Sequence, residues 1–135
     1  MSSRGRIAAA AAAYFVLVFL FGFAFGIIRT QLIAPRTGAL AAVAMEVPLI
    51  LAVSFVLAGA LMRRFAIRRR REAFAFGAIA FFLVMTTEFA FAALFGTAPA
   101  VYLESLATAP GTLGLLGQIL FALVPAARNR WTAPQ

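Results

Sequence analysis

Four long apolar runs, separated by short polar segments, constrain the fold of this chain more than any other feature. The runs cover residues 7–28, 38–62, 73–95 and 110–127. A helix needs about 20 apolar residues to cross the hydrocarbon core of a bilayer, and each run is long enough for one crossing or close to it. Lipid offers no hydrogen-bond partner to the backbone, so each run should be helical. We therefore predict an all-α fold, an integral membrane four-helix bundle that forms a single membrane domain of residues 1–135.

Composition agrees with a membrane location and excludes several kinds of chemistry. Hydrophobic residues make up 64% of the chain and charged residues 12%, against about 25% charged residues in soluble domains. The sequence contains no Cys, His, Lys or Asp. Disulfides, thiolate or imidazole metal sites and Cys or His catalysis are therefore excluded, and acid–base chemistry could use only Glu, Tyr and Arg. We expect no enzyme activity, no catalytic residue, no metal site and no cofactor.

All twelve basic residues are arginines, and their distribution predicts the orientation of the chain in the membrane. If the N-terminus is cytoplasmic, ten of the twelve lie on the cytoplasmic side and only Arg29 and Arg36 lie on the other. Cytoplasmic segments of membrane proteins carry such an excess of positive charge. We expect a multi-pass protein of the cell inner (plasma) membrane with both termini cytoplasmic. Because orientation explains the net charge of +8, no nucleic-acid partner is expected.

The segment between the second and third runs carries a dense cluster of positive charge. Its arginines are Arg63, Arg64, Arg68, Arg69, Arg70 and Arg71. Such a cluster is first of all an orientation signal. It would also attract anionic lipid headgroups, because each basic residue near an anionic membrane surface contributes about 1 kcal/mol. We therefore expect the lipid bilayer, and anionic lipids in particular, among the partners of this chain.

A second group of charged residues lies within or beside the apolar runs. Arg29 and Arg36 lie between the first two runs, while Glu46 and Glu88 lie inside the second and third. At about 1.5 Å of rise per residue, both glutamates fall about 10 to 12 Å below the same membrane surface, so the four residues should form one buried charge cluster. Two interpretations stay open. Arg–Glu pairs would join the helices, whereas unpaired carboxylates would take up a proton in hydrocarbon and form an ion or proton site.

The ends of the runs predict further local features. Pro35 indicates a short, stiff loop after the first run, and the stretch 96–110 predicts a loop or a short interfacial helix. Gly22 and Gly26 lie on one helix face and would let another helix approach closely. A cleaved signal peptide is the alternative for the first run, but the run exceeds the usual apolar length of about 7 to 15 residues. The last run ends in a predicted interfacial anchor formed by Arg128, Arg130 and Trp131.

Several short motifs are spread along nearly the whole chain. They are Gly26-x-x-Arg29, Pro35-Arg36-x-Gly38, Glu46-x-Pro48, Glu88, Tyr102-Leu103 and Phe121-Ala122-x-x-Pro125. This pattern resembles that of small four-span bacterial inner-membrane proteins that are uncharacterised. The resemblance implies a bacterial location and a role for Arg29, Glu46 and Glu88, and it implies no activity. Small multidrug transporters also have four short spans and a membrane glutamate, but theirs lies in the first span, where this chain has none.

Two functions from different classes are compatible with these features. The first is a small integral membrane accessory or scaffold subunit, without catalysis of its own, that joins a larger membrane complex. The second is a small transporter or channel that self-associates into a homo-oligomer and uses the membrane-embedded glutamates. We expect the first of these, and the sequence identifies neither a substrate nor a partner.

Overall fold

The chain forms helices separated by short connections. The computed structural model describes the backbone of residues 1–132 and the side chains of residues 1–129. The helices are α1 (Ser3–Ile28), the π-helical turn η1 (Arg29–Ile33), α2 (Ala34–Thr37), α3 (Ala39–Arg64), α4 (Arg70–Leu94), α5 (Pro99–Ser105) and α6 (Ala109–Thr132). Within the described residues there is no strand, and α1, α3, α4 and α6 are long and apolar enough to cross a membrane. The predicted all-α fold is confirmed.

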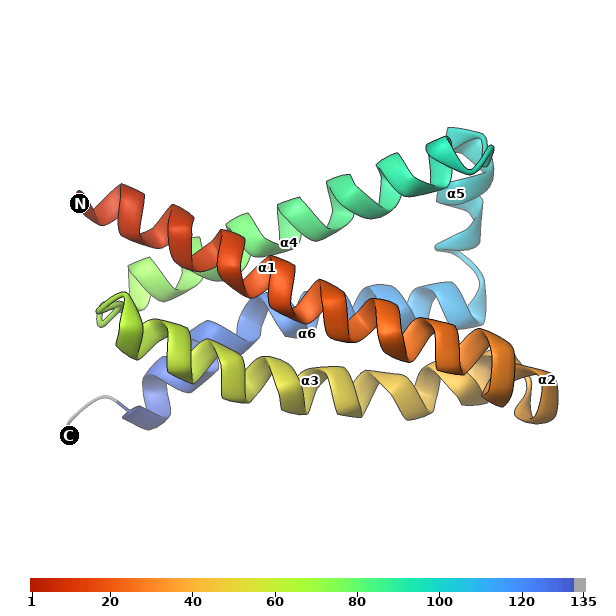
Figure 1. The fold of residues 1–135 in the computed structure, drawn as a ribbon, viewed down its shortest axis with the longest axis horizontal. Helices are drawn as coiled ribbons and strands as arrows, with labels where there is room; N and C mark the ends of the chain where they lie inside the picture. Colours follow the sequence, from red (N-terminus) through yellow and green to blue (C-terminus); the bar gives the residue numbers. More distant parts are fainter. Residues whose placement is uncertain (133–135) are drawn as a thin grey trace.

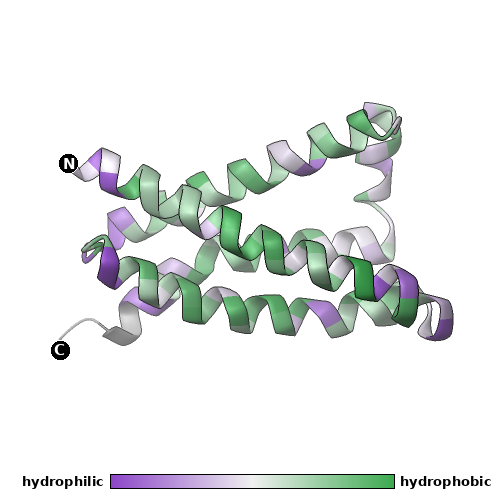
Figure 2. Cartoon of the chain, viewed as in Figure 1, coloured by the Kyte–Doolittle hydropathy of each residue, from purple (hydrophilic) through white to green (hydrophobic). Residues whose placement is uncertain are grey.

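The four long helices form a bundle in which successive helices run in opposite directions (Figure 1). Helix α1 packs against α3 and α4, and α6 packs against the same two helices. The N-terminus and the α3–α4 connection lie at one end, which we call the basic end because it holds the arginines at positions 63, 64 and 68–71. The other end holds α2 and α5, and we call it the α2/α5 end (Figure 1). Figure 2 shows hydrophobic residues along the helix bodies and hydrophilic residues mostly toward the two ends.

An aromatic cluster fills the middle of the bundle. Tyr14 of α1 stacks on Phe121 of α6 with ring centroids 4.4 Å apart, and it meets Phe76 of α4 at 5.0 Å. The Tyr14 hydroxyl donates a 2.9 Å hydrogen bond to the carbonyl oxygen of Phe121. In a regular helix that carbonyl would bond the residue four positions later, but this residue is Pro125, which has no N–H. Tyr14 therefore satisfies the backbone group that Pro125 leaves free.

Helices α4 and α6 approach backbone to backbone at Gly77. A Cβ atom at this position would overlap the carbonyl oxygen of Ala122, so only glycine fits without moving α6. The sequence predicts such a close approach at Gly22 and Gly26 instead, and that prediction was wrong. A Cβ at either position would meet only side-chain atoms, at 3.7 and 3.8 Å, because both glycines line a cavity.

The segment after α1 is helical rather than the loop that Pro35 predicts. The helix continues from α1 through η1 and α2, and the chain turns at Gly38. Proline has no N–H for the carbonyl one turn earlier, and its ring crowds that carbonyl. A widened π turn, in which the Ala34 N–H bonds the carbonyl of Arg29, accommodates the ring without ending the helix. The predicted loop is therefore replaced by a longer first helix.

Gly38 has a backbone conformation that other residues rarely adopt. Its φ of 88° and ψ of 160° fall in a region essentially restricted to glycine. We expect Gly38→Ala to destabilise the protein by about 1 to 3 kcal/mol through backbone strain. Steric overlap contributes nothing, because no atom lies within 4 Å of the added methyl group.

Gly114→Ala is the matched control for Gly38→Ala. Its added methyl group also meets open space, but it lies within α6 at a position without a positive φ. Circular dichroism monitors the unfolding of both variants in detergent micelles and gives the difference between their free energies of unfolding. Equal stability of the two variants would contradict the strain assigned to Gly38.

The stretch 96–110 contains the short helix α5, one of the two predicted alternatives. At the end of α6, Arg128 packs between helices: its guanidinium lies 4.2 Å from the centroid of the Phe55 ring, against Gly59 of α3. Arg128 was predicted as part of an interfacial anchor, and the side chains of its other two members, Arg130 and Trp131, lie outside the described residues.

Candidate intramembrane binding site

A cavity of about 530 Å³ lies inside the bundle, in the half nearer the α2/α5 end. Figure 1 shows α4 separating from α3 and α6 toward this end. The cavity is lined by all four long helices, by η1 and by α5, and most of its wall is apolar. Its volume falls within the range of about 300 to 1,000 Å³ that is typical of small-molecule sites. The polar and charged residues of the wall are Arg29, Thr30, Glu46, Glu88, Tyr102 and Gln118.

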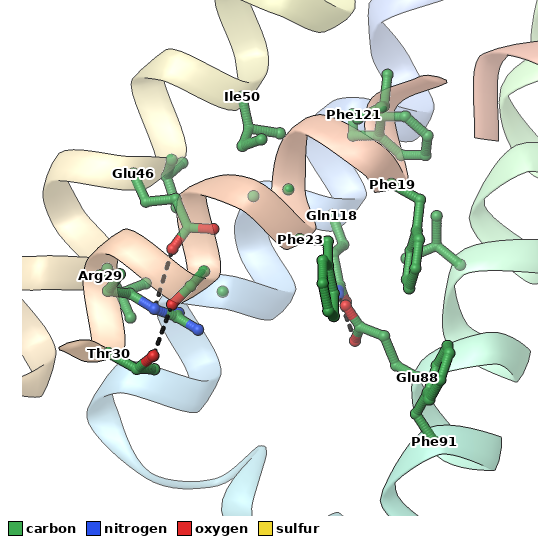
Figure 3. Close-up of a pocket in the computed structure, with 18 of the residues that line it drawn as sticks. Phe19, Phe23, Arg29, Thr30, Glu46, Ile50, Glu88, Phe91, Gln118 and Phe121 are labelled. Atoms are coloured by element: carbon green, nitrogen blue, oxygen red, sulfur yellow. Dashed lines mark hydrogen bonds and ion pairs between the residues drawn. The ribbon is translucent and has the colours of Figure 1, made fainter. Parts of the chain in front are cut away.

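Arg29 and Glu46 form an ion pair at one side of this cavity (Figure 3). Arg29 Nε lies 3.1 Å from Glu46 Oε2, and the two side chains are 32% and 15% exposed. The π turn begins at Arg29, and Ala42, one turn before Glu46 on the same face of α3, is buried. Although the charges are close, the described residues give Glu46 Oε2 no well-directed hydrogen bond. The contact is therefore mainly electrostatic.

Glu88 lies at the other side of the cavity in Figure 3 and is held by neutral donors. Gln118 Nε2 of α6 donates a 2.6 Å hydrogen bond to Glu88 Oε2, and the Tyr102 hydroxyl of α5 donates a longer bond of 3.4 Å to the same oxygen. Among the described residues, no cation lies within 4.0 Å of the Glu88 carboxylate. Glu88 thus links three helices without a close counter-charge.

Tyr102 contributes to the site from the short helix α5. Burial raises the pKa of its hydroxyl, and the nearby Glu88 carboxylate raises that pKa further. The hydroxyl therefore keeps its proton at neutral pH and acts as a donor. The Tyr102 ring also meets the edge of Phe89 at 5.6 Å, which fixes α5 against α4.

The structure brings three of the four residues of the predicted charge cluster to one cavity. Arg29, Glu46 and Glu88 line it, whereas Arg36 is exposed on α2 and forms no ion pair with a described residue. The helical continuation of α1 carries Arg36 beyond the cavity. Gln118 was missed by the sequence interpretation. Its signal was present, because a lone amide inside the last apolar run needs a hydrogen-bond partner in hydrocarbon.

At the basic end, Arg6 of α1 bonds to the α3–α4 connection and to the start of α4. Its Nη1 donates hydrogen bonds to the carbonyl oxygens of Phe65 and Ala66, at 2.9 and 2.8 Å, and its Nη2 lies 3.6 Å from Glu72 Oε1. Glu72 Oε2 in turn accepts from the backbone N–H groups that precede α4. The side chains proposed to meet anionic lipid are all exposed: Arg63, Arg64, Arg68, Arg69, Arg70 and Arg71.

We expect the exposed arginines of the basic end to retain anionic lipid. Replacing Arg68, Arg69, Arg70 and Arg71 together by glutamine should reduce phosphatidylglycerol retention by well over tenfold, because four basic residues near an anionic surface contribute about 1 kcal/mol each. Native mass spectrometry after mild extraction measures the bound lipid. Arg36→Gln, at the other end, is the control. Unchanged retention in the fourfold variant, with orientation intact, would count against lipid binding.

The fold and the cavity together define a class, a small membrane protein of four long helices with a mostly apolar cavity that holds a few charged and polar side chains. Comparison with known proteins adds no family to this description: no family model matches the chain, and neither do curated proteins or solved structures. The cavity and its charged side chains are therefore the features that bear on function.

Proposed function

We propose that the protein is a small transporter that binds its substrate in the cavity, with Glu46 and Glu88 as the charged groups of the site. The observation that carries this proposal is that both carboxylates border open space inside the bundle. Ionisable residues in membrane spans that face a cavity commonly mark a substrate or ion path. A purely structural ion pair would instead be expected among tightly packed side chains, where additional hydrogen bonds compensate its desolvation.

The packing beside the cavity favours a transporter over an open channel. Tyr14, Phe76 and Phe121 fill the bundle between the cavity and the basic end, and α4 touches α6 at Gly77. A substrate could pass this barrier only if the helices shift relative to one another. Such a shift is the alternating access by which transporters work around a fixed central site.

The accessory or scaffold subunit is the second candidate. The same packed barrier favours it, because a subunit without transport needs no path across the bundle. Extraction in mild detergent followed by partner proteomics separates the two candidates. A stoichiometric larger membrane complex would favour the subunit, whereas a homogeneous homo-oligomer would favour the transporter.

Charge movement in proteoliposomes tests the transporter directly. We propose concentration jumps on a solid-supported membrane, using hexyl compounds with an ammonium, a trimethylammonium or a carboxylate headgroup. A neutral molecule that crosses the bilayer unaided carries no charge and gives no current. At least one compound should give a protein-dependent current that Glu88→Gln abolishes.

Glu104→Gln is the matched control, because Glu104 is an exposed glutamate on α5 that does not line the cavity. This variant should keep the full current. If no compound produces a protein-dependent current, or if both glutamate variants lose it equally, the proposed transport function is wrong.

We also propose that both termini and the α3–α4 connection face the cytoplasm of a bacterial inner membrane. The support is the arginine distribution, since ten of the twelve arginines belong to the N-terminus, to that connection or to the end of α6. Reporter fusions at Gln135 and near Pro99 should therefore report opposite sides, with Gln135 cytoplasmic. Reporters on the same side would contradict the four-span orientation.

A further inference from the structure

The polar wall of the cavity has unused hydrogen-bond acceptors. Gln118 Oε1 and Glu46 Oε2 have almost no accessible surface, and neither accepts a hydrogen bond from a residue that the structure describes, although Glu46 Oε2 has the ionic contact with Arg29 Nε. Gln118 donates through its amide nitrogen to Glu88 Oε2, so its amide oxygen accepts nothing from Glu88. A buried acceptor without a donor costs about 1 to 3 kcal/mol. A ligand that carries N–H groups would remove this cost.

The charges of the wall are also unbalanced. Arg29 is the only cationic residue among the described residues that line the cavity, and it faces the two carboxylates of Glu46 and Glu88. Arg29 is paired with Glu46, while Glu88 has only the neutral donors Gln118 and Tyr102. When both carboxylates are ionised, the cavity carries one uncompensated negative charge, which favours protonation of Glu88 until a cation pairs with it. A cationic ligand beside Glu88 would balance it.

The rest of the wall suits an apolar body. Six aromatic rings line the cavity: Phe19, Phe23, Phe91, Phe95, Tyr102 and Phe121. Phe23 of α1 and Phe95, directly after α4, are also 60% and 79% exposed on the outside of the bundle. Phe23 and Phe95 therefore form a rim, at the opening between α1 and α4, that meets the hydrocarbon of the bilayer. An amphiphile could enter sideways, with its tail at the rim and its headgroup inside.

We infer that the cavity takes up an amphiphile with a primary or secondary ammonium group and an apolar tail. The ammonium N–H groups donate to the Glu88 carboxylate and, after the Gln118 amide turns its oxygen toward the cavity, to Gln118 Oε1. The tail lies among the aromatic rings. A quaternary ammonium group has the charge but no N–H, and a carboxylate has the wrong charge. This inference names the substrate class of the proposed transporter and rests on that function, but its binding step can be tested separately.

The test compares two matched pairs of compounds on the protein purified in detergent. Hexylammonium is compared with hexyltrimethylammonium, and short-chain phosphatidylethanolamine with phosphatidylcholine of equal chain length. The first pair represents a free amine and the second a lipid headgroup. The half-saturating concentration for thermal stabilisation should be at least about tenfold lower for the primary ammonium in at least one pair, because the quaternary headgroup leaves acceptors unpaired.

Two variants localise the effect. Glu88→Gln should abolish stabilisation, whereas Glu104→Gln should leave it unchanged and thereby controls for effects of the amphiphile on the micelle. Gln118→Leu, which removes the second acceptor, should lessen the preference for primary over quaternary ammonium. The half-saturating concentration of the quaternary compound should stay nearly unchanged in this variant.

The possible outcomes separate this inference from the proposed function. Equal stabilisation by primary and quaternary headgroups would overturn the inference, even if currents in proteoliposomes still support transport. Selective stabilisation by a primary ammonium without any current would uphold the binding site and its ligand class and overturn the transport function. Stabilisation that survives in Glu88→Gln would place the ligand elsewhere and overturn the inference.

Discussion

Replacing Arg29 by leucine should cost the protein about 3 to 5 kcal/mol of stability, because it leaves the carboxylate of Glu46 without its charge partner in a low-dielectric environment. Arg29 Nε lies 3.1 Å from Glu46 Oε2, and the Glu46 side chain is only 15% exposed. The double variant Arg29→Leu/Glu46→Leu removes both charges and should recover most of the loss. Reversible unfolding in mixed detergent micelles measures each free energy.

The control variants make this prediction specific to one pair. Arg29→Leu/Glu88→Leu should not recover stability, because Glu88 is held by Gln118 and Tyr102 rather than by a close arginine. Arg36→Leu should be nearly neutral, since Arg36 is exposed. If removing Glu46 fails to rescue Arg29→Leu, the ion pair does not stabilise the fold, and the carboxylates would be free to serve a ligand alone.

Gly77→Ala should be the second strongly destabilising change, by about 3 kcal/mol, because the added methyl group overlaps the Ala122 carbonyl oxygen and pushes α4 from α6. A backbone atom cannot rotate away as the end of a side chain can. Gly114→Ala, whose methyl group meets open space within α6, should be neutral or slightly stabilising, since alanine favours helix.

The same unfolding assay measures the Gly77 and Gly114 variants. A Gly77→Ala protein as stable as Gly114→Ala would mean that α4 and α6 do not approach at Gly77. Because Gly77 lies next to the aromatic cluster and not in the cavity wall, the comparison also tests the barrier between the cavity and the basic end.

The helices were predictable from the sequence because hydrocarbon imposes one solution on long apolar runs. A similar position of Glu46 and Glu88 along the bundle was also predictable, since each lies a similar distance from the end of its run on the same side. Their common cavity was not, because it depends on the separation of α4 from α3 and α6 (Figure 1). Helix packing of this kind has no local sequence signal.

Two further features depended on contacts between residues far apart in the chain. The carbonyl that Pro125 leaves free is satisfied by Tyr14 of another helix, and the Glu88 carboxylate by Gln118. In each case the members stood out in the sequence as a proline or as polar groups inside apolar runs, but no local signal showed which residues pair. The π turn at Arg29 was missed for a different reason, because Pro35 indicates a helix end more often than a helix with one widened turn.

Photoaffinity labelling tests most directly whether the cavity is the ligand site. The probe is a primary alkylamine with a diazirine in its tail, applied to the protein in lipid nanodiscs, and the labelled peptides are identified by mass spectrometry. We expect label on the segments that border the cavity between α1 and α4, at residues 19–27 and 84–95. Excess hexylammonium should displace this label, and Glu88→Gln should abolish it. Label spread evenly over the lipid-facing surfaces of all four long helices, without displacement, would contradict this expectation.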